Sequence, residues 1–261
     1  MTRPRHALDD WARLRRTLRG AEPLLLLTDF DGTLAPIVRD ASRAGIADTT
    51  RQLLRALSRC RGVCAGVVSG RALSWLRKRV GVADLVYVGN HGLEIRGPGV
   101  RFVHPLAHQH TASLTRLAHN LRRALRGVSG TWVEAKRFTL SVHWRTVPPR
   151  DVQAFQRRAR AALAPWVSAG RIRFTAGKRV IEIRPPLNWD KGKAVEWLIA
   201  RCKGSVWYLG DDQTDESAFR MVNRHDGVSI LVGRRTATQA LWWLATPSEV
   251  RRLLSRLVAI R

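Results

Sequence analysis

Acidic side chains are scarce in this chain, so the places where they occur are informative. The 261 residues include 20 Asp and Glu against 46 Lys and Arg, which gives a formal net charge of +26 and a sequence pI near 11.7. A field of this sign attracts nucleic acid, acidic membranes and small anionic substrates. The basic residues are mostly Arg, spread over the polar faces of expected helices, and no zinc-finger or RNA-recognition motif accompanies them. We therefore expect no specific nucleic-acid partner.

Long apolar runs are also missing. The longest are short, such as 24–27 and 63–68, whereas a helix needs about 20 apolar residues to cross a bilayer. Segment 7–19 is expected to form an amphipathic helix that stops at Gly20, and it carries Asp and Arg, unlike the apolar region of a secretion signal. These absences predict a cytoplasmic protein with no membrane partner.

Cysteine is rare, and its spacing shows no repeat. The three cysteines are Cys60, Cys64 and Cys202. We interpret them as small apolar side chains beside a buried strand. A metal or redox pair formed by Cys60 and Cys64 is the alternative.

Strand-like and helical segments alternate in the first ninety residues. Apolar runs at 24–28, 63–68 and 85–88 are separated by helical spacing at 49–59 and 72–80. This alternation is typical of a parallel sheet with helices on both faces. It resumes after residue 186 with a helix from 190, a strand at 205–209, a helix from 215, a strand at 228–232 and a helix from 248. The fold class expected is a doubly wound α/β core.

The alternation of strands and helices stops near residue 97, where a turn is expected at 97–99. A helix is expected over 106–126, followed by strands at 131–134 and 138–144; a second helix, 148–167, is followed by strands at 171–175 and 180–184. Helix–strand–strand, occurring twice, predicts an inserted α+β domain. We therefore assign residues 1–103 and 185–261 to the core and 104–184 to the insert.

Six of the 20 acids lie in two short segments. They are Asp29 and Asp31 after the first strand, and Asp211, Asp212, Asp215 and Glu216 after the strand at 205–209. Ligands of open α/β sheets bind at the carboxyl ends of the strands. Carboxylates that converge there repel one another and need a cation. Oxygen ligands without His or Cys favour Mg²⁺.

Asp29 and Asp31 have the spacing for two roles in phosphoryl transfer. They flank Phe30, so in extended backbone both side chains point the same way. One carboxylate can attack phosphorus while the other moves the leaving-group proton. Gly32 permits a sharp turn after them.

The segment 29–33, Asp-x-Asp-Gly-Thr, resembles the first motif of the haloacid dehalogenase superfamily of phosphatases. Three further motifs follow in order: Ser69 at the end of the second strand, Lys191 at the start of a helix, and 210–215 after a later strand. The resemblance implies that Asp29 is the nucleophile and Asp31 the general acid and base. It also implies that Ser69 and Lys191 hold the phosphate oxygens.

The same resemblance implies a metal site and part of a substrate site. Mg²⁺ would be bound by Asp29, the backbone carbonyl of Asp31, and Asp211. Asp212 and Asp215 would orient ligands or waters. The residues after Ser69, Gly70 and Arg71, are assigned to substrate binding.

Several segments are similar to trehalose-6-phosphate phosphatases within this superfamily. They are 89–94, 134–136, 143–145, 177–185 and 210–216. The resemblance implies that Glu134, Lys136 and Glu182 bind sugar hydroxyls and that His91 lies at the rim of the core. It also implies that the insert is a cap, because it falls between the second and third motifs.

The residues themselves leave an alternative open for the insert. Glu134 and Lys136 alternate, so they share one face of a strand. Such a pair suits a neutral, hydroxyl-rich ligand, but it is also typical of a surface ion pair. His143 and Arg145 are left as residues that support the fold.

The leading hypothesis is hydrolysis of trehalose 6-phosphate to trehalose and phosphate, with Mg²⁺ and an aspartyl-phosphate intermediate, by a monomer or weak oligomer. A phosphatase acting on sucrose phosphate or a glycosyl phosphoglycerate is the alternative within the same superfamily. An alternative of another class is a nucleic-acid-binding protein on a phosphatase fold.

Overall fold

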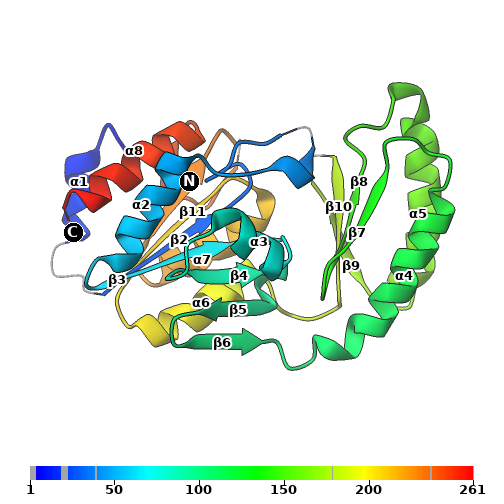
Figure 1. Cartoon of the computed structure of the whole chain (residues 1–261), viewed down its shortest axis with the longest axis horizontal. Helices are drawn as coiled ribbons and strands as arrows, with labels where there is room; N and C mark the ends of the chain where they lie inside the picture. The colour runs from blue at the N-terminus through cyan, green and yellow to red at the C-terminus, as the bar shows by residue number, and fades with distance from the viewer. Residues whose placement is uncertain (1–3, 19–22, 39, 178, 236, 261) are drawn as a thin grey trace. The chain divides into compact units, whose positions relative to one another are not determined.

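The chain divides into two compact units. The computed structural model describes residues 4–18, 23–38, 40–177, 179–235 and 237–260 (Figure 1). One unit holds the chain up to Phe102 and from Trp189 onward, and the other is Val103–Asn188. The expected insert, 104–184, falls within the second unit.

The first unit is built on a mostly parallel sheet. In the described part of the chain its nine strands are β1 (Arg5–His6), β2 (Leu24–Asp29), β3 (Val63–Val68), β4 (Val86–Gly89), β5 (Glu94–Gly97), β6 (Val100–Val103), β11 (Ser205–Gly210), β12 (Val228–Val232) and β13 (Trp242–Leu244). Their order is β1-β13-β12-β11-β2-β3-β4-β5-β6. Adjacent strands pair in parallel from β1, at one edge of the sheet, through to β4. The next strand, β5, pairs antiparallel with β4.

Helices cover both faces of this sheet. They are α1 (Trp11–Arg16), α2 (Asp48–Arg59), α3 (Leu73–Val80), α6 (Lys191–Cys202), α7 (Glu216–Arg224) and α8 (Pro247–Val258). All six residues of β2 are buried, and they alternate between two apolar layers. Leu24 and Leu26 pack with side chains of α1, α2, α3 and α8, whereas Leu25 and Leu27 pack with those of α6 and α7. The continuous Leu run therefore forms a strand that is buried on both faces.

The register of the central strands brings the expected motifs to one edge of the sheet. Asp29, the last residue of β2, pairs with Val68, which precedes Ser69. Thr28 pairs with Leu209, two residues before Asp211. The carboxyl ends of β2, β3 and β11 therefore meet, as a doubly wound sheet requires.

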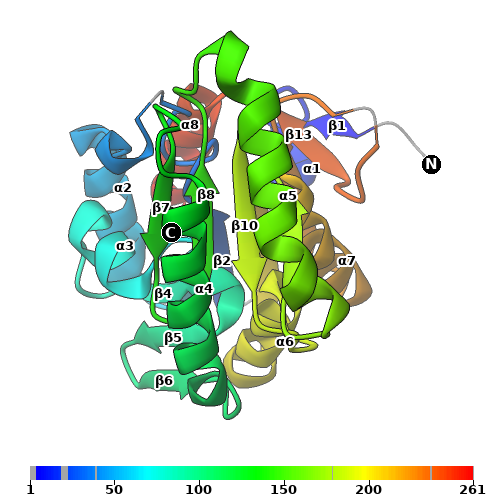
Figure 2. The same ribbon diagram turned by 90° about the vertical axis from the view of Figure 1, so that its right-hand side faces the viewer.

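The second unit is a four-stranded antiparallel sheet with two helices on one face (Figure 2). Its elements are α4 (Thr111–Ala124), β7 (Trp132–Ala135), β8 (Leu140–His143), α5 (Val152–Ser168), β9 (Arg173–Ala176) and β10 (Val180–Arg184). The strand order is β7-β8-β10-β9. Val133, Val142 and Ile183 pack against the helices in one apolar core. The intervening strand residues face the other side of the sheet.

The doubly wound α/β core with an α+β insert is confirmed, with differences at the sheet edges. The turn expected at 97–99 joins β5 to β6, and neither strand was predicted. The helix expected over 7–19 is shorter: α1 begins at Trp11 because Arg5 and His6 pair with β13. Its expected end at residue 19 lies outside the described residues.

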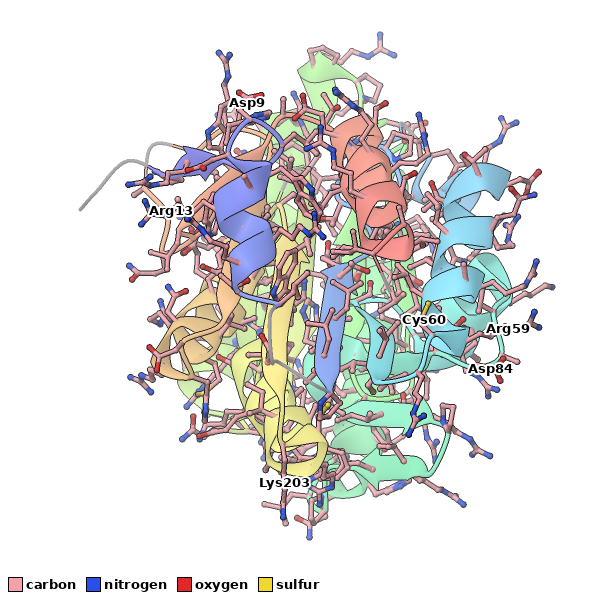
Figure 3. All side chains as sticks on the ribbon, turned by 90° about the vertical axis from the view of Figure 1, so that its left-hand side faces the viewer. Asp9, Arg13, Arg59, Cys60, Asp84 and Lys203 are labelled. Atoms are coloured by element: carbon pink, nitrogen blue, oxygen red, sulfur yellow. The ribbon has the colours of Figure 1, made fainter. Side chains whose placement is uncertain are left out.

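Basic side chains extend from the surface of the first unit. Figure 3 shows Arg13, Arg59 and Lys203 reaching outward, and Arg59 lies 4.0 Å from a carboxylate oxygen of Asp84. Within the described ranges, no helix combines the length and the apolar character that crossing a membrane requires.

We expect Leu26→Ala to lower the free energy of unfolding by about 2–5 kcal/mol, since Leu26 is buried on the central strand and truncation leaves a cavity. Ile37→Ala is the control, because its side chain is 45% exposed and should cost less than about 0.5 kcal/mol. Urea unfolding measures both. Equal losses would contradict the placement of β2 at the centre of the core.

Candidate active site

A buried lysine links two acidic segments that are far apart in the sequence. The Lys191 Nζ atom, at the start of α6, lies 2.8 Å from Asp29 Oδ1 and 2.7 Å from Asp215 Oδ1. All three side chains are almost wholly buried. Asp190 caps this end of α6 by accepting a hydrogen bond from the Lys193 backbone N–H at 3.0 Å, so the first turn that carries Lys191 is fixed.

Three carboxylates form a group that could hold a metal ion. Ligand atoms of Asp29, Asp211 and Asp215 all lie within 4.8 Å of one another. Gly32 makes this approach possible: its φ is +85°, and a Cβ at that position would lie 2.2 Å from Asp211 Oδ2. Three negative charges against the one positive charge of Lys191 leave −2, which a divalent cation would neutralise. An all-oxygen donor set of this kind fits Mg²⁺.

Asp215 accepts hydrogen bonds from several elements of the site. Besides Lys191, it accepts the Tyr208 hydroxyl at 2.6 Å and the backbone N–H groups of Asp211 and Asp212 at 3.0 Å each. These bonds fix the loop after β11 and hold Asp211 toward Asp29. Tyr208 was not among the expected site residues. The signal for it was a hydroxyl in an otherwise apolar strand, two residues before Gly210.

The charge balance of the group shifts its pKa values. Burial raises the pKa of Asp29 well above its usual range; Lys191 opposes this, while Asp215 and Asp211 raise the pKa further. Burial also acts to lower the pKa of Lys191, but Asp215 and Asp29 outweigh it and the pKa lies above its usual value. Lys191 is therefore a permanent cation, and the group carries surplus negative charge when no metal is bound.

Asp31 has a different partner. Its two carboxylate oxygens accept hydrogen bonds from Arg71, with Nε to Oδ2 at 2.9 Å and Nη2 to Oδ1 at 2.8 Å. A two-point pair fixes the orientation of a carboxylate as well as its position. Arg71 was expected to bind substrate, and its contact with Asp31 was not foreseen.

Ser69, Gly70 and His91 lie together beside this pair. The His91 backbone N–H donates to the Ser69 carbonyl at 3.1 Å, and the Ser69 hydroxyl accepts the Arg71 backbone N–H at 3.1 Å. A Cβ on Gly70 would lie 2.4 Å from the His91 ring, so only glycine fits there. His91 is buried with a positive φ of 56°. The segment therefore stacks the histidine over the turn that ends β3.

Asp212 stands apart from the buried group. It is the N-cap of the short 3-10 turn Gln213–Asp215, and its side chain accepts the Gln213 backbone N–H at 2.6 Å. Its side chain is 40% exposed. The structure thus brings Asp29, Asp211, Asp215 and Lys191 into one cluster and leaves Asp212 at its margin.

The second unit carries a row of polar side chains on the sheet face opposite its helices. Glu134 pairs with Ser141 across β7 and β8, and Ser141 pairs with Glu182 across β8 and β10. Ser141 Oγ lies 2.9 Å from both carboxylate oxygens of Glu182, and Lys136 Nζ lies 3.2 Å from one of them. Ser141 was not predicted, because it stands between apolar residues in the sequence.

Glu134 contacts one of two stacked aromatic rings in this row. Its Oε2 atom lies 2.9 Å from His143 Nε2, and the His143 ring stacks on Trp132 with centroids 4.7 Å apart. Glu134, Lys136 and Glu182, expected to act together, therefore lie on one face of one sheet. His143 contacts Glu134 directly, so it supports the position of that carboxylate.

Comparison with solved structures identifies the fold. A haloacid dehalogenase-like hydrolase from Bacteroides thetaiotaomicron matches 89% of this chain and 98% of its own length, with a TM-score of 0.63 and 15% identity. The C-terminal domain of the C. albicans trehalose-6-phosphate phosphatase matches 99% of this chain and 98% of its own length, with a TM-score of 0.86 and 24% identity. The chain has the fold of the haloacid dehalogenase superfamily.

Sequence comparison narrows the class to one family. Residues 27–248 match the trehalose-phosphatase family, and the chain belongs to it. A probable trehalose-phosphate phosphatase 4 of Oryza sativa is 34% identical over 97% of this chain and 70% of its own length. A probable trehalose-phosphate phosphatase H of Arabidopsis thaliana is 33% identical over 97% and 76%. The chain is accordingly a phosphoric monoester hydrolase.

We expect Mg²⁺ binding to release protons. Because the pKa of Asp29 is raised, the metal-free protein keeps a proton on this carboxyl group at pH values above the usual titration range of Asp. A cation that binds there must displace this proton. Metal affinity should therefore rise with pH from that range upward. Titration calorimetry in two buffers of different ionisation enthalpy counts the protons, with Asp29→Asn as the variant that should release fewer. Binding without proton release would show that Asp29 is already ionised.

Proposed function

We propose that this protein hydrolyses trehalose 6-phosphate to trehalose and phosphate through an aspartyl phosphate, an acyl phosphate formed on Asp29. The observation that carries the proposal is the buried ion pair of Lys191 with Asp29, within a group of three carboxylates at the carboxyl edge of the sheet. A carboxylate held beside an ammonium can approach an anionic phosphate that would otherwise repel it. Membership of the trehalose-phosphatase family supports the substrate.

The chemistry proceeds in two displacements. A carboxylate oxygen of Asp29 bonds to phosphorus while the bond to the sugar oxygen breaks, and Asp31 gives that oxygen its proton. Asp31 then takes a proton from water as the water oxygen bonds to phosphorus and the bond to Asp29 breaks. Lys191 and Ser69 would hold the phosphate oxygens in both steps. Positioning and charge neutralisation supply most of the rate.

The metal proposed for this site is Mg²⁺. Asp29, Asp211 and the backbone carbonyl of Asp31 would bind it, and Asp215 would hold the loop that presents Asp211. When bound, Mg²⁺ neutralises charge on the carboxylates and on the phosphate. Asp212 would act at most through bound water, since its side chain caps the turn at residues 213–215.

The inserted unit would supply the sugar contacts and act as a cap. Trehalose presents hydroxyl groups and no charge, so its recognition needs fixed polar side chains. Glu182 is held by Ser141 and Lys136, and Glu134 by His143, which gives both carboxylates defined orientations. Gly70 and His91 are the core residues that we assign to the same substrate, whereas Arg71, which the sequence assigned to it as well, bonds to Asp31.

A panel of sugar phosphates tests the proposal. Trehalose 6-phosphate should release phosphate with the highest kcat/KM, and activity should stop in chelator and return with Mg²⁺. Asp29→Asn should lower kcat by at least about 10³-fold because an amide cannot form the acyl phosphate. A higher kcat/KM for sucrose phosphate or a glycosyl phosphoglycerate would contradict the assignment of trehalose 6-phosphate as the substrate. Full activity in Asp29→Asn would exclude the nucleophile.

The sugar role of Glu182 predicts a loss that depends on the substrate. Glu182→Gln should lower kcat/KM for trehalose 6-phosphate by about 10-fold or more, since a hydrogen bond from a sugar hydroxyl to a charged group is worth roughly 1.5–3 kcal/mol. Hydrolysis of 4-nitrophenyl phosphate should change little. Asp151→Asn, which removes a half-exposed acid of the same unit, is the matched control. Equal losses on both substrates would make Glu182 structural.

A further inference from the structure

The indole of Trp75 contacts two groups that border Asp31. Trp75 is half-buried on α3, and its ring meets the edge of Phe30 at a centroid distance of 5.5 Å and an angle of 89°. The Arg71 guanidinium lies over the same ring, 4.5 Å from its centroid. Phe30 stands between Asp29 and Asp31, so Trp75 packs against the side chain of the residue that separates the two carboxylates.

Arg71 is held at both its backbone and its side chain. The backbone N–H donates to Ser69 Oγ at 3.1 Å, and the carbonyl accepts the Asn90 N–H at 2.8 Å. The guanidinium has Trp75 beneath it and Asp31 at its edge, and the side chain is 9% exposed. A long flexible side chain is thereby confined to one conformation.

This arrangement has a consequence for proton transfer. A general acid must lie within hydrogen-bond reach of the oxygen that leaves, and small displacements are costly. Both oxygens of Asp31 accept from Arg71, and each keeps a further lone pair for another partner. The fork of Arg71 can thus set the plane of the carboxylate without blocking it.

We propose that Arg71 and Trp75 are positioning residues for Asp31. Trp75 holds the guanidinium, and the guanidinium holds the carboxylate in the orientation from which Asp31 protonates the sugar oxygen. The inference rests on the proposed function and deepens it, because it adds Trp75, which touches neither phosphate nor sugar in this account, to the residues on which turnover depends.

A change of leaving group distinguishes a residue that positions Asp31 from a residue that binds phosphate. A sugar oxygen leaves as an alkoxide unless it is protonated, whereas 4-nitrophenolate is stable and leaves without a proton. A misplaced Asp31 should therefore slow the first turnover of the sugar phosphate and spare the first release of 4-nitrophenolate. A residue that binds phosphate would affect both equally.

The test measures first-turnover rates of the whole chain with Mg²⁺ on both substrates, with the KM of each. Arg71→Lys keeps the charge but loses the two-point fork, and Trp75→Leu removes the aromatic face beneath it. We expect the sugar-to-aryl rate ratio to fall about 100-fold in Arg71→Lys and about 10-fold in Trp75→Leu, within the range of general acid catalysis, with KM little changed. Trp75→Phe, which keeps an aromatic face, should restore most of the ratio.

Arg79→Met is the matched control. The Arg79 guanidinium lies 5.5 Å from the centroid of the same indole but donates to the Ser42 carbonyl, so its loss should leave the ratio unchanged. An unchanged ratio in Arg71→Lys, whether both rates fall together, only KM rises or nothing changes, would overturn the positioning role. A wild-type protein that hydrolyses neither substrate would instead remove the proposed function, and the positioning role with it.

Discussion

The candidate site depends on one buried ammonium group placed between two carboxylates. Lys191 contacts Asp29 and Asp215 at 2.8 and 2.7 Å in a region that water scarcely reaches. A buried charge is tolerated only when its partners satisfy it, and removal of one partner leaves the others exposed to the full cost of burial. The start of α6, the end of β2 and the loop after β11 are therefore bound to one another by electrostatics as well as by packing.

The surplus of negative charge explains the unusual placement of acids in so basic a protein. Lys191 alone does not neutralise Asp29, Asp211 and Asp215. The pKa of Asp29 is raised by its burial first, and the charges of Asp215 and Asp211 raise it further. A site with this balance favours a divalent cation, and with it an anionic ligand. Asp31 is paired with Arg71 and is not part of this negatively charged group. Asp29 and Asp31 thus have different cationic partners, which suits different chemical roles.

The sequence predicted much of the fold and the acidic cluster, for identifiable reasons. The Leu run of β2 and the acids that follow β2 and β11 are local patterns, and the rule that ligands bind at strand ends joins them without knowledge of side-chain geometry. Lys191 was found by its motif at a helix start. The edge strand β1 and its neighbour β13 were missed, because two or three residues carry no period of their own.

The contacts missed are those between residues that no motif joins. Ser141 meets Glu182 and Tyr208 meets Asp215 through strand register and loop closure, neither of which leaves a periodic trace. The fork between Arg71 and Asp31 spans 40 positions in the sequence. Trp75 has the spacing of a core residue, and it does pack against the core, but its contact with Arg71 follows from the start of α3.

The most direct measurement is a crystal structure of the protein with Mn²⁺ in place of Mg²⁺ and beryllium fluoride as a phosphoryl mimic. The account predicts one anomalous peak within about 2.0–2.3 Å of oxygens from both Asp29 and Asp211, and the beryllium of the mimic bonded to a carboxylate oxygen of Asp29. A cation bound away from Asp29, or a mimic attached to another residue, would contradict it.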